Sequence, residues 1–306
     1  MSKIKVGFGP GVGAAGGMGA EDFFGLIDTL ERAGWDSIWF SERLGGDILD
    51  PLAAMGVAIG YSQRLKFGFS VLVLPGRNPV VLAKELATLD VLSKGRIVAA
   101  FGLGSPLPDE SAAFGVSRKE RAGRTDEATK LITKLWTEDN VTFEGKYYTV
   151  RDFTLRPKPV QTPMPDIWFG GHSEAACRRV GRVGTGWLPS FVAPSEYKTK
   201  VDLIKAEAER NGREIEWDHY GALVAYIPPG REDVKETVMS VLSARRPEVD
   251  AQQIVVTDGD EALRAKLEEF VTQGASKFVV VPAVPPADWD DELGRLHESV
   301  VRPLES

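Results

Sequence analysis

Cysteine and histidine are scarce in this chain, which has one cysteine, Cys177, and three histidines among 306 residues. A disulfide needs two cysteines and a cysteine-based zinc site needs several, so the sequence predicts neither within the chain. Small and apolar neighbours such as Val180 favour a core thiol at Cys177 over a nucleophile. Because His172, His219 and His297 lie without the spacing of metal ligands, we predict no metal site.

The chain also has no basic block and no long apolar run. Its 44 acidic and 37 basic residues give a net charge of −7, so nucleic acid and membrane surfaces are not expected partners. No apolar run reaches the roughly 18 residues of a membrane-spanning helix, and the apolar part of the first residues is too short for a secretory signal. We expect a cytoplasmic globular protein that acts on a small molecule.

Several common catalytic motifs are missing. We find neither the G-x-S-x-G turn of a hydrolase nor a P-loop. A dinucleotide-binding fold would need G-x-G-x-x-G opening a helix after a strand. Gly7, Gly9, Gly11 and Gly13 have a different spacing and precede more loop, which disfavours a nicotinamide dinucleotide site.

Strand and helix patterns alternate along the chain. The expected strands are Ile4–Gly9, Asp36–Phe40, a strand from Leu65 to Leu74, one ending at Gly102-Leu103-Gly104, Asp166–Phe169, Gly186–Pro189, His219–Ile227 and Lys277–Val281. The expected helices are about Ala20–Ala33, Asp50–Ile59, Asn78–Gly95, Arg118–Trp136, Ser173–Val183, Ser195–Asn211, Glu232–Ala244, Glu261–Gln273 and Glu292–Val300. Eight strands separated by helices predict an α/β fold, a (β/α)8 TIM barrel, with a doubly wound sheet as the alternative.

Two stretches interrupt this alternation. We predict one domain over residues 1–306, with inserted loop segments at about 103–120 and 140–165 on the carboxyl-terminal face of the barrel. Short alternating pieces and four prolines in the second stretch indicate an inserted hairpin followed by an extended segment.

Barrel enzymes place their working residues at the carboxyl ends of the strands. Glu42 and Arg43 follow the second strand, where they form either a rim ion pair or a ligand-binding pair. A guanidinium keeps its proton at neutral pH, so Arg43 can only orient or neutralise an anion. Gly102 and Gly104, after the fourth strand, allow either a tight turn or close approach to a ligand.

The best candidate for an anion site follows the fifth strand, where Phe169-Gly170-Gly171-His172-Ser173 leads directly into a helix. Two glycines free the backbone there. A helix N-terminus presents unpaired N–H groups and a partial positive charge, which favours phosphate binding. In the alternative interpretation, Ser173 only caps the helix.

Beyond these patterns, the chain resembles the bacterial luciferase-like superfamily in the segments AGWDSIWFSERL, RNPVVLAKELATLDVLSKGRIVAAFGLG and YYTVRDFTLRPKPVQTPMPDIWFGGHSEAACRRVGRVGTGWLP. The subgroup it resembles most is the deazaflavin (coenzyme F420)-dependent oxidoreductases of actinobacteria. The resemblance implies a barrel that holds a flavin-type ring at its carboxyl face, with F420 as the cofactor and FMN as the alternative. By analogy with relatives, it also implies a homodimer.

The resemblance implies a role for particular residues in binding this cofactor. Ser70-Val71 matches the position of a non-proline cis peptide packed behind the ring. Leu103 and Gly104 match a wall of the ring pocket. The loop from Phe169 to Ser173 matches the phosphate-binding loop, in agreement with the helix-terminus argument.

Two departures from the family pattern bear on the chemistry. Many relatives end the second strand with an acidic residue and a histidine, whereas this chain has Glu42-Arg43, which we predict to be catalytic. The sugar-phosphate dehydrogenases of the subgroup place a carboxylate where Ser105 stands, so Ser105 is expected to face another substrate than glucose 6-phosphate. Hydride transfer between the deazaflavin C5 and a small organic substrate is the predicted activity. An FMN monooxygenase and a flavin-binding barrel without turnover remain alternatives.

Overall fold

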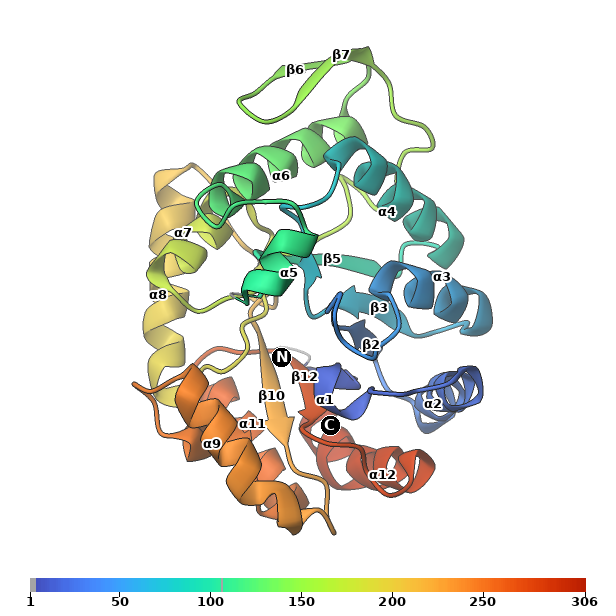
Figure 1. Ribbon diagram of the computed structural model, residues 1–306, viewed down its shortest axis with the longest axis vertical. Coiled ribbons are helices and arrows are strands. Elements are labelled where there is room, and N and C mark those ends of the chain that lie inside the picture. The colour runs from blue at the N-terminus through green and yellow to red at the C-terminus, as the bar shows by residue number, and fades with distance from the viewer. Residues whose placement is uncertain (1–3, 106) are drawn as a thin grey trace.

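The computed structural model describes residues 4–105 and 107–306, and it is built on a curled, mostly parallel sheet surrounded by helices (Figure 1). Residues 1–3 and 106, which fall within the predicted domain and its first insertion, lie outside the described residues. The strands of the main sheet are β1 (Lys5–Phe8), β2 (Ser37–Phe40), β3 (Lys66–Phe69), β4 (Leu72–Val73), β5 (Ile97–Gly102), β8 (Ile167–Phe169), β9 (Gly186–Trp187), β10 (Gly221–Tyr226), β11 (Val255–Val256) and β12 (Lys277–Pro282).

The strand order is β11-β10-β12-β1-β2-β3-β5-β8-β9, with β4 paired to β5 beside this path. Each of the eight predicted strands has a counterpart, although the third is divided into β3 and β4. The two-residue strand β11 was not predicted. It pairs with the last two residues of β10, and a strand this short shows no periodicity in the sequence.

The structure has an open, curled sheet where a closed barrel was predicted. The hydrogen-bonded strand order begins at β11 and ends at β9. Two isolated parallel bridges, Trp187–Tyr220 and Ser190–Leu223, lie between β9 and β10 in place of a continuous ladder. The physical reason is local, because β9 is only two residues long and β11 occupies the edge of β10 at Ala225 and Tyr226.

The helices follow the strands in the predicted alternation. They are α1 (Gly11–Ala14), α2 (Ala20–Ala33), α3 (Pro51–Tyr61), α4 (Pro79–Ser93), α5 (Pro108–Ala113), α6 (Arg121–Thr137), α7 (Glu174–Val183), α8 (Pro194–Arg210), α9 (Lys235–Arg245), α10 (Ala251–Ile254), α11 (Gly259–Thr272), α12 (Trp289–Leu296) and α13 (Arg302–Glu305), with a 3-10 turn at Glu232–Val234 and a π-helical turn at His297–Val301. Among the described residues, no helix is long and apolar enough to span a bilayer.

Helix α4 illustrates how local sequence sets the element boundaries. The Asn78 side chain accepts hydrogen bonds from the N–H groups of Val80 and Val81, and Pro79 occupies the first turn, where its missing N–H costs nothing. The helix ends at Lys94, which has a left-handed φ of 59°, and Gly95 follows it.

Both faces of the sheet are buried, and alternate residues of a strand belong to different clusters. The outward side chains, such as Phe101 and Phe169, join the main core between sheet and helices. The inward side chains form a second cluster, in which the rings of Trp39 and Trp168 lie 6.0 Å apart. A Cβ at Gly68 would overlap the Trp39 indole, so glycine makes room for this packing. The inward cluster fills the inside of the curled sheet.

The expected hairpin is present in the segment 140–165. It consists of the antiparallel strands β6 (Val141–Glu144) and β7 (Thr149–Phe153) and projects from the molecule next to α6 (Figure 1). The carboxylate of Glu127 on α6 accepts hydrogen bonds from the backbone N–H groups of three residues in the turn, Lys146, Tyr147 and Tyr148. The hairpin is thereby fixed to the helix that precedes it.

Candidate active site at the carboxyl ends of the strands

The loops after β3, β5 and β8 meet around one side chain, Val71. The non-proline cis peptide expected at Ser70-Val71 is present. A Cβ at Gly102 would overlap the Val71 side chain, and a Cβ at Gly170 would lie 3.0 Å from its Cγ1. The Ser70 hydroxyl in turn lies 3.1 Å from that of Ser41, at the end of β2. The two glycines therefore allow three strands to converge on Val71 and form a cradle that holds its side chain; a larger residue at position 102 or 170 would displace it.

Glu42 points toward the chain that follows the cis peptide. One carboxylate oxygen accepts a hydrogen bond from the Val73 N–H at 2.6 Å, and the other pairs with the guanidinium of Arg77. The Glu42 side chain is only 1% exposed. Burial raises its pKa, while Arg77 and the Val73 N–H oppose that shift. Both oxygens are thus engaged within the protein, an arrangement suited to positioning the β3–β4 segment.

Arg43 faces the inserted segment after β5. Its Nε lies 3.9 Å from an oxygen of Glu110, and the same oxygen accepts a hydrogen bond from the Gly45 N–H at 2.9 Å. Glu42 and Arg43, predicted together, thus have separate partners. Sequence reasoning missed both partners, Arg77 and Glu110. Arg77 had a weak signal, since it follows the third strand, while Glu110 is one of several acids in its segment.

A small cavity with about 210 Å³ of unfilled space lies beside the end of β5. It is lined by Val73, Pro75, Leu103, Gly104, Ser105, Ser111, Phe114, Val116 and Arg121. Ser105, the predicted substrate contact, and the predicted wall residues Leu103 and Gly104 therefore share one cavity.

The wall at Leu103–Ser105 is held in shape by Arg121, which the sequence analysis did not identify. Its Nη1 donates to the carbonyl oxygens of Leu103, Gly104 and Ser105, at 3.2, 3.4 and 2.7 Å. Burial, with a smaller contribution from Arg118, lowers the pKa of the Arg121 guanidinium. Because this buried cation donates hydrogen bonds to backbone carbonyls, we interpret its role as stabilising the loop.

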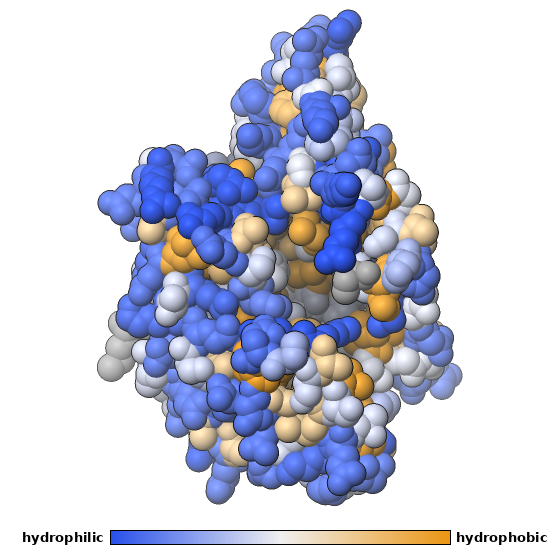
Figure 2. All heavy atoms as spheres, turned by 60° about the vertical axis from the view of Figure 1, so that its left-hand side comes forward, coloured by the Kyte–Doolittle hydropathy of each residue, from blue (hydrophilic) through white to orange (hydrophobic). Residues whose placement is uncertain are grey.

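A second, mostly apolar cavity with about 370 Å³ of unfilled space lies between the loops after β1 and β2. It is lined by Pro10, Gly11, Ala15, Met18, Phe23, Phe40, Ser41, Ile48, Leu49 and Ala54. The glycine-rich loop after the first strand is partly ordered as α1 and forms a wall of this cavity. The molecule is also hollowed below the projecting hairpin, with apolar residues at the bottom of the hollow (Figure 2).

The loop Gly170–Ser173 leads from β8 into α7. The Ser173 hydroxyl accepts a hydrogen bond from the Ala176 N–H, so this side chain caps the helix, as the alternative interpretation held. Within the described residues, the N–H groups of Glu174 and Ala175, which precede Ala176 in the first turn, remain available to a ligand. Lys200 donates to the carbonyl oxygen of His172 at 2.9 Å.

The surroundings of His172 carry charges of both signs. Burial lowers its pKa, and the charges of Arg246 and Lys200 lower it further, while Glu196 and Glu248 oppose the shift. Arg246 is itself 4% exposed and paired with Glu196 and Glu248. These cations lie on and after distant helices, where sequence offers no sign of their proximity. A helix N-terminus beside cations is suited to a phosphate.

Residues 3–277 match the model of the luciferase-like monooxygenase family. The chain belongs to this family.

Individual relatives differ in the cofactor that their names specify. The F420-dependent glucose-6-phosphate dehydrogenase of Nakamurella multipartita is 32% identical over 274 residues, which cover 86% of this chain and 79% of that protein. The FMNH(2)-dependent dimethylsulfone monooxygenase of Pseudomonas putida is 32% identical over 238 residues, which cover 75% of this chain and 63% of that protein. Among solved structures, an F420-dependent secondary alcohol dehydrogenase in complex with an F420–acetone adduct has a TM-score of 0.83 at 20% identity over 99% of each chain, which shows a shared fold.

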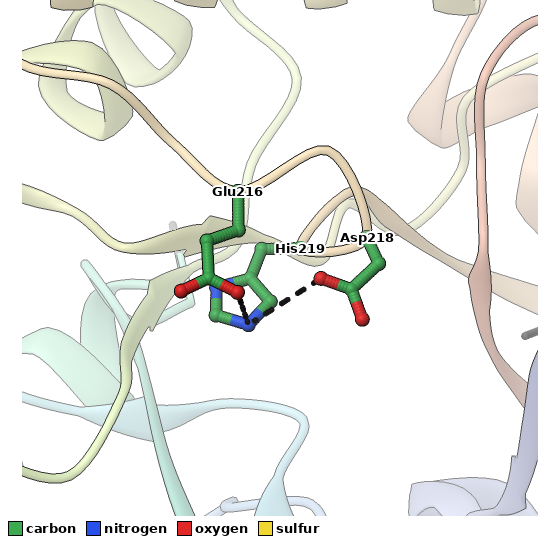
Figure 3. A group of neighbouring side chains, drawn as sticks. All are labelled: Glu216, Asp218 and His219. Carbon is green, nitrogen blue, oxygen red and sulfur yellow. Dashed lines mark ion pairs between the residues drawn. The ribbon is translucent and has the colours of Figure 1, made fainter. Parts of the chain in front are cut away.

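A cluster of two carboxylates and a histidine in this luciferase-like chain lies outside the candidate site. Glu216 and Asp218 each place a carboxylate oxygen 3.8 Å from Nε2 of His219, at the amino end of β10 (Figure 3). The Nδ1 of His219 lies 2.9 Å from the Thr185 carbonyl oxygen. The spacing of the histidines in the sequence gives no sign of these flanking carboxylates, so the cluster was not predicted. The opposite end of β10, at Tyr226, is the end nearer the candidate site.

The single cysteine offers a simple test of the packing. Cys177 is fully buried in α7, and burial raises the pKa of its thiol to about 11. Only about one thiol in a thousand is then ionised at pH 8, and iodoacetamide reacts with the thiolate. We expect no labelling of the native protein at pH 8 and complete labelling in urea, as measured by mass spectrometry. Rapid labelling of the native protein would contradict the predicted structural role.

Proposed function

We propose that this luciferase-like protein is an F420-dependent oxidoreductase that transfers a hydride between the deazaflavin C5 and a small organic substrate. The observation that carries the proposal is the cradle of Val71, Gly102 and Gly170 next to the phosphate-suited start of α7. Curated relatives with F420-dependent names support the choice of cofactor. We further propose that the sheet closes as a (β/α)8 barrel, which the bridges between β9 and β10 support.

The residues at the site fit such a cofactor. The glycines at 102 and 170 seat the Val71 side chain, against which we propose that a flat ring packs, and the N–H groups at the start of α7 suit a phosphate, with Lys200 close by. When bound, the deazaflavin supplies a two-electron hydride donor or acceptor at C5. We propose that the protein contributes position, because rigid walls fix the faces of ring and substrate.

The charged residues after β2 have distinct proposed roles. Arg43 lies at the rim with its side chain 36% exposed, where it would stabilise negative charge that develops on a substrate carbonyl oxygen. Glu42 has both oxygens engaged, so we propose that it supports the β3–β4 segment and that solvent delivers the proton. The cavity wall around Ser105 is mostly apolar, which favours an uncharged activated alkene or carbonyl compound over a sugar phosphate.

One titration tests the cofactor assignment. The purified protein is titrated with F420 and, separately, with FMN, and binding is followed by fluorescence. We expect quenching with F420, followed by oxidation of the reduced form when an enone or a quinone is added. Tight binding of FMN with none of F420 would overturn the proposal. Binding of F420 without turnover of any enone or quinone would indicate a binding protein.

A second candidate function is an FMN-dependent monooxygenase. The relative from Pseudomonas putida, whose name specifies FMNH(2), favours it. It predicts consumption of oxygen in the presence of a flavin reductase, which an oxygen electrode measures directly.

The role proposed for Arg43 predicts a specific kinetic split. Arg43→Ala is expected to lower kcat at least about tenfold, equivalent to about 1.4 kcal/mol, because an interaction made mainly in the transition state is lost. The dissociation constant for F420 should change little. Arg151→Ala is the control, since Arg151 is 78% exposed on the hairpin. Equal loss of turnover in both variants, or none in either, would refute the role.

A further inference from the structure

The inserted helix α5 lies next to the small cavity at the end of β5. It also contacts the loop after β2. Ser111 and Phe114 line the cavity from above. Phe114 also packs on the turn after β4, where a Cβ at Gly76 would lie 2.6 Å from its ring. Figure 1 shows α5 in front of the end of β5. The segment therefore covers the cavity.

A single carboxylate joins this cover to the loop after β2. Glu110 is 5% exposed although it belongs to a short surface helix. It accepts the Gly45 N–H at 2.9 Å and faces the Nε of Arg43 at 3.9 Å. A buried carboxylate is stable only where such partners satisfy it. The contact spans 65 residues of sequence and links two loops that each border the site.

Glycines with left-handed backbone angles flank the cover on both sides. Gly104 has a φ of +83° and Gly115 has a φ of +64°. Among residues 4–105 and 107–306, no atom lies within 4 Å of a Cβ placed on Gly115. Residues of this kind absorb the backbone rotation of a hinged segment at little cost. Two side chains of the cover, Ser111 and Phe114, line the cavity. A movement of the cover therefore changes the space that is open to a substrate.

We propose that residues 107–114 form a hinged lid over the substrate cavity and that Glu110 is the positioning residue that holds it closed. The identity of the substrate in this inference rests on the proposed function, whereas the existence of the lid does not. The closed lid excludes water from the cavity and sets the position of Arg43 at the rim. Opening breaks the bond from Gly45 to Glu110 and separates Glu110 from Arg43.

Three variants separate the contributions to the closed state. Glu110→Ala removes both contacts. Glu110→Gln keeps an acceptor for the Gly45 N–H and removes the charge that faces Arg43. Asp109→Asn makes the same change of charge at an exposed position of the same helix and serves as the control. Circular dichroism and thermal unfolding establish that each variant is folded.

Hydrogen exchange of the protein without cofactor tests the lid directly. In Glu110→Ala we expect the amide of Gly45 and the amides of segment 107–114 to exchange about tenfold faster, the factor that a lost hydrogen bond of about 1.4 kcal/mol implies. Glu110→Gln should show a smaller change and Asp109→Asn none. Unchanged exchange in Glu110→Ala, or equal changes in all three variants, would overturn the proposal. Because no cofactor is present, this result stands even if F420 does not bind.

Kinetics then connect the lid to the substrate. With reduced F420 and 2-cyclohexen-1-one as the probe, Glu110→Ala should raise KM several-fold while the dissociation constant for F420 changes less than about twofold. A residue with only a structural role would alter both together. A parallel loss of F420 affinity, or an unchanged KM, would refute the link between lid and substrate.

Discussion

A methyl group at position 102 is expected to weaken the binding of F420 at least about tenfold, which corresponds to about 1.4 kcal/mol. The Cβ of Gly102→Ala would overlap Val71, whose other methyl group already lies against Gly170. The valine therefore has no room to rotate away and is displaced toward the open side of the cradle. Overpacking of this kind also costs about 1–3 kcal/mol of stability. Fluorescence titration with F420 measures the first effect and urea denaturation the second.

A glycine without neighbours provides the matched control for position 102. Gly294 lies in α12, and no atom of the described part of the chain is found within 4 Å of a Cβ placed there. Gly294→Ala should leave F420 binding unchanged and should stabilise the protein by about 0.5–1 kcal/mol, because alanine is favoured over glycine inside a helix. If Gly102→Ala binds F420 as tightly as Gly294→Ala, the cradle does not hold the ring.

Removal of the Glu42 carboxylate is expected to lower the free energy of unfolding by about 3 kcal/mol. Glu42→Ala leaves the Arg77 guanidinium and the Val73 N–H without their buried partner. The Arg77 side chain is 20% exposed, so partial hydration keeps the loss at the lower end of the range for broken buried pairs. The displaced β3–β4 segment should also reduce turnover. Urea denaturation and steady-state kinetics measure the two effects.

The same removal of a carboxylate from an exposed ion pair shows how much of the expected loss of stability is due to burial of the pair. Glu144 pairs with Arg151 on the hairpin, and their side chains are 66% and 78% exposed. Glu144→Ala should change the free energy of unfolding by less than about 0.5 kcal/mol, since exposed pairs contribute little. If Glu42→Ala were as mild as Glu144→Ala, the pair with Arg77 would have no structural importance.

The fold was predictable to the extent that its elements leave local patterns. Helix α4 was expected between Asn78 and Gly95, and its cap residues occupy those positions because capping depends only on neighbours in sequence. The cis peptide at Ser70-Val71 was expected from the family resemblance and not from composition, whereas the division of the third strand at this point was not predicted. Strand β11 and the open ladder were not predictable, since two-residue strands have no period and their pairing depends on which edge is free.

For the candidate site, backbone features were predictable and charge pairs were not. Gly102, Gly170 and Gly171 were identified because glycine at the end of a strand has a recognisable local purpose. Glu42 and Arg43 were found as residues, but their partners Arg77 and Glu110 lie 35 and 67 positions away. The cations near His172, Lys200 and Arg246, lie 28 and 74 positions further along the chain. Charged side chains occur over the whole surface of a protein, so the sequence alone does not show which partner each of them contacts.

By itself, the sequence determined the alternation of strands and helices, the glycines at the strand ends, and membership of the luciferase-like family, because each depends on the order of neighbouring residues. Only the tertiary structure decided that Glu42 is engaged with Arg77, that Arg121 shapes the loop at Ser105, and that Glu110 joins α5 to the loop after β2. Charges attract through space and not along the chain. The curl of the sheet brings its loops to one rim and thereby determines which charged side chains form pairs.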